Sequence, residues 1–288
     1  MDGRVTGGLG LRELARRTWR EVYTHNTLGR AAELAYYFLL AFFPMLIVLL
    51  SLISLVPTLK ETVLFWVLSL MPPDAKQILR DWLTNVFGSR RGGLLSLGLV
   101  FSLWAASTGM TALMGALNEA YDVQEWRPFW KSRLIALGLT IALSILVIGG
   151  ASAINYGEPV AKWIANRVGL GGVLTMLGSA PYYLMGLAML TLGMGLIYYI
   201  APNVQLNWIR IAPGTIFAVL SFILVSYLFS VYLTFAPSYD ATYGSIGAIV
   251  VLMLWFYLLG LVICIGGEIN AEIHKVAGER IIEKERRV

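Results

Sequence analysis

Charged side chains are scarce in this sequence, at 14% of 288 residues, whereas soluble domains carry about 25%. Hydrophobic residues fill 58% of the positions, so the chain cannot supply the polar surface that a soluble fold of this size needs. The single cysteine, Cys264, excludes an intrachain disulfide and leaves no set of thiolates for a metal. These shortages exclude an ordinary soluble domain and a disulfide-stabilised one, and they favour a membrane protein.

Groups suited to acid–base or metal chemistry are also few. The two histidines, His25 and His274, lie in polar flanks without metal-ligand spacing. No HExxH, GxSxG, phosphate-loop or dinucleotide-binding glycine pattern occurs in a usable context. We therefore predict a protein that is not an enzyme, has no catalytic or metal-binding residues, and needs no cofactor.

Six long apolar stretches occupy much of the remaining chain. Each is long enough to cross the hydrocarbon core, which needs about 20 apolar residues in a helix. The apolar runs are continuous rather than alternating, which favours helices over a barrel. The sequence predicts an all-α polytopic membrane protein with spans at about 31–56, 93–117, 134–156, 173–200, 211–235 and 245–267. A segment over 1–30 precedes this domain (31–273), and a charged tail follows at 274–288.

Basic residues predict the topology. With six spans the termini share one side, and most of the 22 lysines and arginines fall in the segments on that side. The positive-inside rule then predicts that both termini lie in the cytoplasm. No cleavable signal peptide is evident, because the first apolar stretch is too long for one. We expect the net charge of +5 to contact anionic lipids rather than nucleic acid.

Two amphipathic helices are expected outside the spans. Residues 11–23 place Leu11, Leu14, Ala15, Thr18, Trp19 and Val22 on one face. This helix either lies on the cytoplasmic membrane surface or packs against the ends of the spans. In the first outer loop, residues 74–87 form a second apolar stripe, which either anchors in the interface or covers the bundle like a lid.

Small residues and prolines predict how the spans pack. In the second span Ser102, Ala105, Gly109, Ala112, Ala116 and Ala120 recur at helical spacing, which lets helices approach closely. Pro44 and Pro181 are expected to kink the first and fourth spans.

Polar residues gather at both ends of the spans and are the candidate substrate-binding sites. The inner set consists of Glu33, Asn118, Glu119, Glu268 and Asn270. These groups either form a polar vestibule or pair with Arg30, Arg127, Arg133, Arg210 or Lys275 at the headgroup level.

The outer set consists of Tyr239, Asp240, Tyr243, Gly244 and Ser245. Here Gly244 is expected to form a turn just before the sixth span, which Ser245 would cap. The helix N-terminus would attract an anion, or would simply be capped without a ligand.

Several sequence blocks carry a family resemblance. They are AAELAYYFLLAFFP (31–44), ALNEAYDV (116–123), YYIAPN (198–203), APGTIFA (212–218) and YDATYGSIGAIVVLMLWFYLLGLVICIGGEINAE (239–272). With these blocks in order, the chain resembles the YihY/BrkB family of bacterial inner-membrane proteins. The resemblance implies six helices and cytoplasmic termini. The family carries an old ribonuclease label and has been associated with virulence and with movement of lipids or other solutes.

From the residues and the resemblance together we predict a transporter, most simply a flippase-like carrier of a lipid or amphiphilic anion. The expected partners are membrane lipids and such a substrate. The alternative is an envelope scaffold or regulatory membrane protein that transports nothing. No metal triad or general base for RNA hydrolysis is evident, so we do not expect a ribonuclease.

Overall fold

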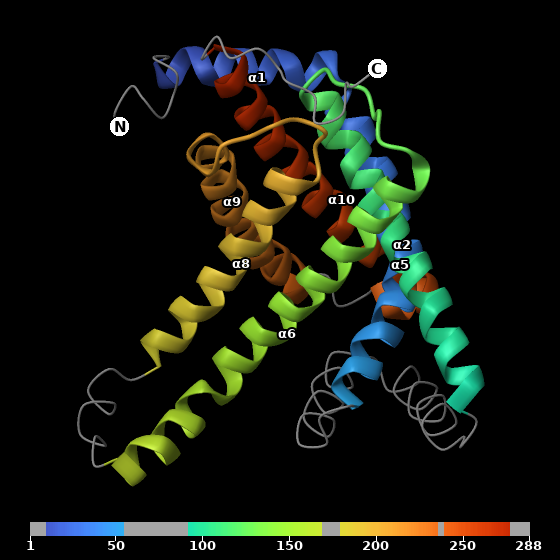
Figure 1. Ribbon diagram of the computed structural model, residues 1–288, viewed down its shortest axis with the longest axis vertical. Coiled ribbons are helices and arrows are strands. Elements are labelled where there is room, and N and C mark those ends of the chain that lie inside the picture. The colour runs from blue at the N-terminus through green and yellow to red at the C-terminus, as the bar shows by residue number, and fades with distance from the viewer. Residues whose placement is uncertain (1–9, 55–91, 169–178, 236–238, 277–288) are drawn as a thin grey trace. The chain divides into compact units, whose positions relative to one another are not determined.

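The computed structural model describes residues 10–54, 92–168, 179–235 and 239–276, and these residues form helices joined by short connections. The helices are α1 (Leu11–Thr24), α2 (Thr27–Ser54), α5 (Gly92–Ala120), α6 (Phe129–Val168), α8 (Ala180–Ile200), α9 (Trp208–Phe235) and α10 (Tyr239–Val276) (Figure 1). No helix or strand is described for the outer loop at 74–87, so that prediction lies outside the described residues.

Each of the six predicted spans coincides with a long helix. Within the described residues, four helices are long and apolar enough to cross a membrane, at Phe129–Pro159, Ala180–Ile200, Trp208–Leu233 and Ile249–Val276. The all-α class is therefore confirmed for the described residues, while the crossing of α2 and α5 stays a prediction.

Three local predictions are corrected by the helix bounds. α10 begins at Tyr239, so Gly244 and Ser245 lie inside the helix and are neither a turn nor a cap. Pro181 sits in the first turn of α8, where its missing N–H would have had no helical partner, so it causes no kink. α6 continues to Val168, well beyond the predicted end at 156.

The chain separates into two compact units, residues 40–109 and the remainder. The larger unit contains α1, the start of α2, the end of α5 and all of α6 to α10.

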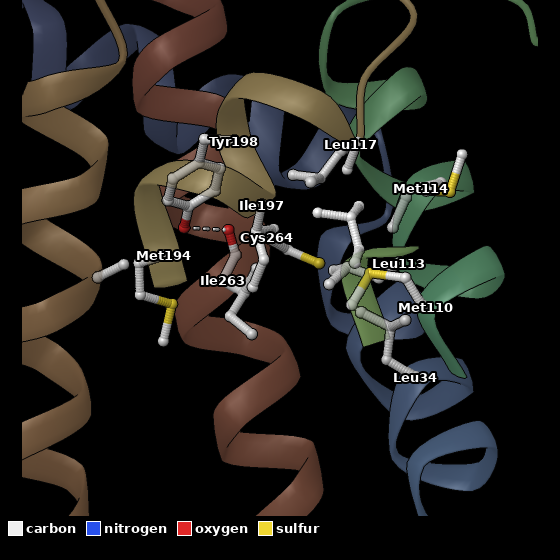
Figure 2. Packing of buried hydrophobic residues seen from close by; sticks show 14 of the residues in the cluster. Leu34, Met110, Leu113, Met114, Leu117, Met194, Ile197, Tyr198, Ile263 and Cys264 are labelled. Atoms are coloured by element: carbon white, nitrogen blue, oxygen red, sulfur yellow. Dashed lines mark hydrogen bonds between the residues drawn. The ribbon is translucent and has the colours of Figure 1, made fainter. Parts of the chain in front are cut away.

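The core of the larger unit is built where its helices pack together. α5 contributes the buried Met110, Leu113 and Leu117, and α8, α9 and α10 pack around them with Ile197, Ile211 and Ile263 among others. Ala112 and Ala116 belong to the same interior, as the small-residue stripe of the second span predicts. Figure 2 shows this cluster, in which the Tyr198 hydroxyl donates a hydrogen bond of 2.8 Å to the Ile263 carbonyl.

Glycines allow α9 and α10 to pack closely against each other. A Cβ on Gly214 of α9 would collide with the carbonyl oxygen of Gly266 on α10, and a Cβ on Gly266 would collide with the Tyr198 hydroxyl. The two backbones can approach this closely only because neither position carries a side chain.

α1 packs against α10 (Figure 1). Its buried stripe consists of Leu14, Thr18 and Val22, spaced four residues apart. Ala15 and Trp19, predicted on the same face, are exposed instead, because the contact with the bundle is narrower than the apolar stripe. The structure thus shows α1 packed against α10, and contact of α1 with the membrane surface stays a prediction.

Candidate functional site

A charged cluster closes the end of the larger unit where α1 meets α2 and where α5 and α10 end. We call it the charged end, and it consists of Glu21, His25, Thr27, Arg30, Glu33, Glu119, Asp122, Glu268, Glu272 and Lys275.

His25 lies at the centre of the charged end. Its Nδ1 lies 3.0 Å from Oε1 of Glu268 on α10, and its Nε2 lies 3.0 Å from Oδ1 of Asp122, just after α5. Glu21 of α1 approaches the same Nε2 at 3.5 Å. One imidazole therefore joins the α1–α2 connection to two other elements of the bundle.

This geometry favours a protonated imidazole. A carboxylate accepts hydrogen bonds, so two carboxylates on opposite ring nitrogens are both satisfied only when both nitrogens carry protons. Burial alone would lower the pKa of His25, but the charges and hydrogen bonds of Glu268 and Asp122 outweigh it and raise the pKa above 6.5. The structure thus favours an imidazolium held between two acids.

The two acids differ sharply in their surroundings. Glu268 is 2% exposed and, besides His25, accepts a hydrogen bond of 3.3 Å from the Thr27 hydroxyl. The side chain of Asp122 is 56% exposed and also pairs with Nζ of Lys275 at 2.5 Å. Burial would raise the pKa of Asp122, yet Lys275 and His25 together lower it. The buried Glu268 depends on His25 far more than Asp122 does.

A second ion pair lies beside the first. The Nε of Arg30 on α2 donates to Glu119 on α5, and its Nη1 contacts Glu33 at 2.8 Å. Hydrogen bonds to Glu119 and Glu33 raise the pKa of Arg30. The structure therefore shows Glu33 and Glu119 paired with Arg30, which is one of the two alternatives left open by the sequence. Asp122 pairs with Lys275.

Asn118 belongs to a separate polar cluster around the α8–α9 connection. Its Oδ1 accepts the backbone N–H of Asn203 at 2.7 Å, and its Nδ2 donates to Glu125 at 3.0 Å. Arg127 completes the cluster, donating to Asn203 Oδ1 at 3.2 Å and to the Ala201 carbonyl at 2.9 Å. Asn118, Arg127 and Asn203 are all buried. The cluster therefore links the α5–α6 connection to the α8–α9 connection and does not open to a ligand.

Asn270 has a third role. Its Oδ1 accepts the backbone N–H of Gly214 at 2.8 Å, one residue after Pro213 in α9. The side chain is 1% exposed, and its Nδ2 has no hydrogen-bond partner among the described residues. Asn270 therefore joins α9 to α10 at the point where their glycines let them meet.

A polar cleft of about 700 Å³ lies between α1 and the end of α10. Arginines, a lysine and glutamates line it, among them Arg17, Arg20, Glu272 and Lys275. Several of these charges already pair with one another, as Glu13 does with Arg16 at 3.0 Å and Arg17 at 2.9 Å. The cleft is accordingly a surface of mixed charge beside the charged end.

The predicted inner set is thus gathered at one end but divided among four contacts. Glu33 and Glu119 meet at Arg30, Glu268 meets His25, and Asn118 and Asn270 form helix-joining hydrogen bonds. The side chains of the outer set, Tyr239 to Ser245, lie outside those that the structure describes, so that binding site stays a prediction.

Sequence reasoning assigned no role to His25 or Asn203, and it named Arg127 only as a partner for acidic groups at the headgroup level. His25 and Glu268 are 243 residues apart, and no spacing rule links a lone histidine to so distant an acid. Asn203 offered one signal, because it ends the YYIAPN block. Among the described residues, no group of three or more His, Cys, Asp or Glu side chains could hold a metal ion.

Comparison with known proteins identifies the family. The sequence matches the family model described as "Virulence factor BrkB" over residues 18–288. The chain belongs to the BrkB family. The resemblance seen in the sequence blocks is therefore confirmed. Relatives in this family are named as membrane proteins, and four described helices of this chain are apolar enough to cross a bilayer.

Three relatives illustrate the BrkB family. "Putative ribonuclease-like protein YfkH" of Bacillus subtilis (strain 168) is 39% identical over 89% of this chain and 94% of that protein. A "UPF0761 membrane protein" of Vibrio campbellii is 30% identical over 89% of this chain and 80% of its own length. A UPF0761 membrane protein of Nitrosospira multiformis is 27% identical over 87% of this chain, which spans only 58% of that longer protein. No solved structure matches the chain.

Proposed function

We propose that this protein is a membrane carrier of flippase type, which moves a lipid or an amphiphilic anion between the two leaflets. One observation carries the proposal: the Glu268 carboxylate is 2% exposed within the apolar helix Ile249–Val276 and is bound by a histidine from the N-terminal segment. Ionisable groups inside membrane helices are costly to bury, and they commonly line substrate or ion pathways.

In this proposal the charged end is the gate at one mouth of the pathway. The imidazolium of His25 holds α10, the α1–α2 connection and the end of α5 together through Glu268 and Asp122. When His25 loses a proton, one of its two nitrogens becomes an acceptor that faces a carboxylate, and that contact turns repulsive. Loss of one proton therefore weakens the contacts that close this end.

The same geometry favours a carrier over a hydrolase. A general base needs a free nitrogen to take a proton from substrate or water. Both ring nitrogens of His25 are held by carboxylates, and His274 is 2% exposed with its ring packed edge-on against Tyr121, 6.2 Å between centroids. Neither histidine presents a nitrogen to an open site.

The outer set supplies the opposite mouth in this proposal. Tyr239, Asp240 and Tyr243 fall in the first turns of α10, at the end of that helix remote from Glu268. An anionic headgroup would meet the positive end of the helix dipole there.

A translocation assay in proteoliposomes tests the proposal. Purified protein should exchange fluorescent phospholipids between leaflets faster than empty liposomes do, with a rate that changes with pH. Glu268→Gln keeps a hydrogen-bond acceptor for His25 but removes the charge, so its rate should no longer follow pH. Glu13→Gln, which removes an exposed acid on α1, serves as the matched control and should behave as wild type.

Rates equal to those of empty liposomes, with and without an imposed ion gradient, would count against carriage of the lipids tested. The second candidate function, a scaffold that transports nothing, would then take precedence. One observation favours it: Trp19 and Tyr23 stack edge-on at 5.2 Å on the exposed face of α1, and exposed aromatic pairs are common at protein interfaces.

A further inference from the structure

An open groove lies between α8 and α9, and none of its lining residues belongs to the charged end. Its volume is about 620 Å³, within the range of about 300–1,000 Å³ that small-molecule sites occupy. α8 lines one wall from Leu184 to Gly195, and α9 lines the other from Trp208 to Ile216.

The lining of the groove is mostly apolar. Leu187, Leu192 and Ile216 present aliphatic side chains, and all three are exposed at the surface. Two threonines also line it, but their hydroxyls donate to their own helix, Thr191 to the Leu187 carbonyl and Thr215 to the Ile211 carbonyl, each at 2.8 Å. The groove therefore offers a ligand methyl groups and no free hydroxyl donor.

The position of the groove decides what surrounds it. Both walls belong to helices that are apolar enough to cross a membrane, Ala180–Ile200 and Trp208–Leu233. Water is not held in a hollow that lacks polar partners, and an empty hollow forfeits the dispersion contacts of its lining. Within a bilayer the available material that fills such a space is hydrocarbon.

We infer that the groove between α8 and α9 is a binding site for one acyl chain of a membrane lipid. The site goes beyond the proposed function, because it holds a chain whether or not the protein moves lipids between leaflets.

Trp208 defines the headgroup end of this site. Its indole stacks on the Tyr199 ring, with centroids 4.7 Å apart and an angle of 17° between the planes. The indole also lies over Gly195, where an added Cβ would come within 3.1 Å of the ring. Tryptophan prefers the depth of the headgroups in a bilayer, so the chain runs from Trp208 along the groove towards Leu184.

Photo-crosslinking tests the inference directly. The protein is reconstituted in vesicles that contain phosphatidylethanolamine with a diazirine in one acyl chain, irradiated, digested and mapped by mass spectrometry. Label should concentrate on peptides from α8 and α9. Ala188→Phe places a phenyl ring in the groove, so labelling of these peptides should fall by roughly fivefold or more.

Ala151→Phe is the matched control, because Ala151 is an exposed alanine on the membrane-crossing part of α6 and does not line the groove. This variant should keep the wild-type labelling of α8 and α9. The inference is overturned if label spreads evenly over the exposed faces of α6, α8, α9 and α10, or if Ala188→Phe and Ala151→Phe label alike. Circular dichroism and gel filtration of both variants show whether each is folded, and a variant Ala212→Phe repeats the test from the α9 wall.

Lipid translocation measured on the same vesicles keeps the two proposals apart. Loss of labelling in Ala188→Phe with unchanged translocation supports the acyl-chain site and separates it from carriage. Groove labelling in a protein that moves no lipid supports the site and counts against the carrier.

Discussion

Replacing His25 by alanine should destabilise the protein more than any other single change at the charged end. The substitution leaves the Glu268 carboxylate, which is 2% exposed, with the Thr27 hydroxyl as its remaining hydrogen-bond partner among the described residues. Removing one member of a buried ion pair costs about 3–5 kcal/mol, because the remaining charge is buried without compensation.

The two arms of the His25 contact contribute unequally. The Asp122 side chain is 56% exposed and keeps Lys275, so losing that arm costs only about 0–1 kcal/mol. The Glu268 arm therefore dominates, and since Thr27 remains, we expect a loss near the lower limit, about 3 kcal/mol. At roughly 2–4 °C per kcal/mol, Tm should fall by about 6–12 °C.

The pH dependence gives the sharper test. The pKa of His25 is raised in the folded protein. Its contribution to the free energy of unfolding is therefore complete below the unfolded-state pKa of 6.5, and it is lost as the pH rises through the folded-state pKa. Wild-type protein in detergent should therefore melt at a higher temperature at about pH 6 than at about pH 9. The His25→Ala variant should lose most of this difference in melting temperature.

A compensating variant checks the physical cause. Combining His25→Ala with Glu268→Gln removes the uncompensated charge, so the double variant should be more stable than His25→Ala alone by about 1–2 kcal/mol. The reasoning is refuted if His25→Ala melts within about 2 °C of wild type, or if the double variant is less stable than the single one. Glu13→Gln, on the exposed face of α1, should leave the melting temperature unchanged.

Three further predictions concern packing and the remaining ion pairs. Gly214→Ala should cost about 1–3 kcal/mol by forcing α9 from α10, whereas Gly115→Ala, which has open space around it, should be neutral or stabilising in the same melting assay. Arg127→Lys should cost about 1–3 kcal/mol, because a lysine cannot bond Asn203 and the Ala201 carbonyl together, and loosening of the α8–α9 connection should appear as faster hydrogen exchange there. Asp122→Asn should make the protein less sensitive to acid. The pKa of Asp122 is lowered in the folded protein, so its contribution to stability is present above pH 3.8 and is lost as the pH falls through the folded-state pKa. Identical acid unfolding of the variant and the wild type would contradict this.

The positions of the long helices were predictable because their cause is local. Continuous apolar stretches of sufficient length specify helices in lipid, and α2, α5 and α9 begin and end within a few residues of the predicted spans. The start of α10 was not predictable in the same way. Gly244 is typical of a turn, yet an apolar helix can extend through a glycine at a cost of about 1 kcal/mol, which packing easily offsets.

The candidate site was predictable in composition but not in its pairing. Acidic residues at the ends of spans indicate a polar end, and Glu33, Glu119 and Glu268 do gather there. The partner of Glu268 depends on how a short N-terminal helix folds back over α10, and that is a tertiary contact between residues at opposite ends of the chain. Asn118 and Asn270 show the same limit, since their partners are backbone N–H groups of Asn203 and Gly214, which no side-chain pattern reveals.

The length of α6 has a consequence for the lipid environment. Its uncharged stretch, residues 134–157 between Arg133 and Glu158, has 24 residues and so measures about 36 Å at 1.5 Å per residue. The hydrocarbon core is about 30 Å thick, so a membrane-crossing helix of this length is slightly longer than the core and fits by tilting or by drawing thicker lipid around itself. Vesicles made from longer-chain phospholipids relieve that mismatch, and melting temperature should rise with acyl-chain length until the bilayer thickness approaches the apolar length of α6.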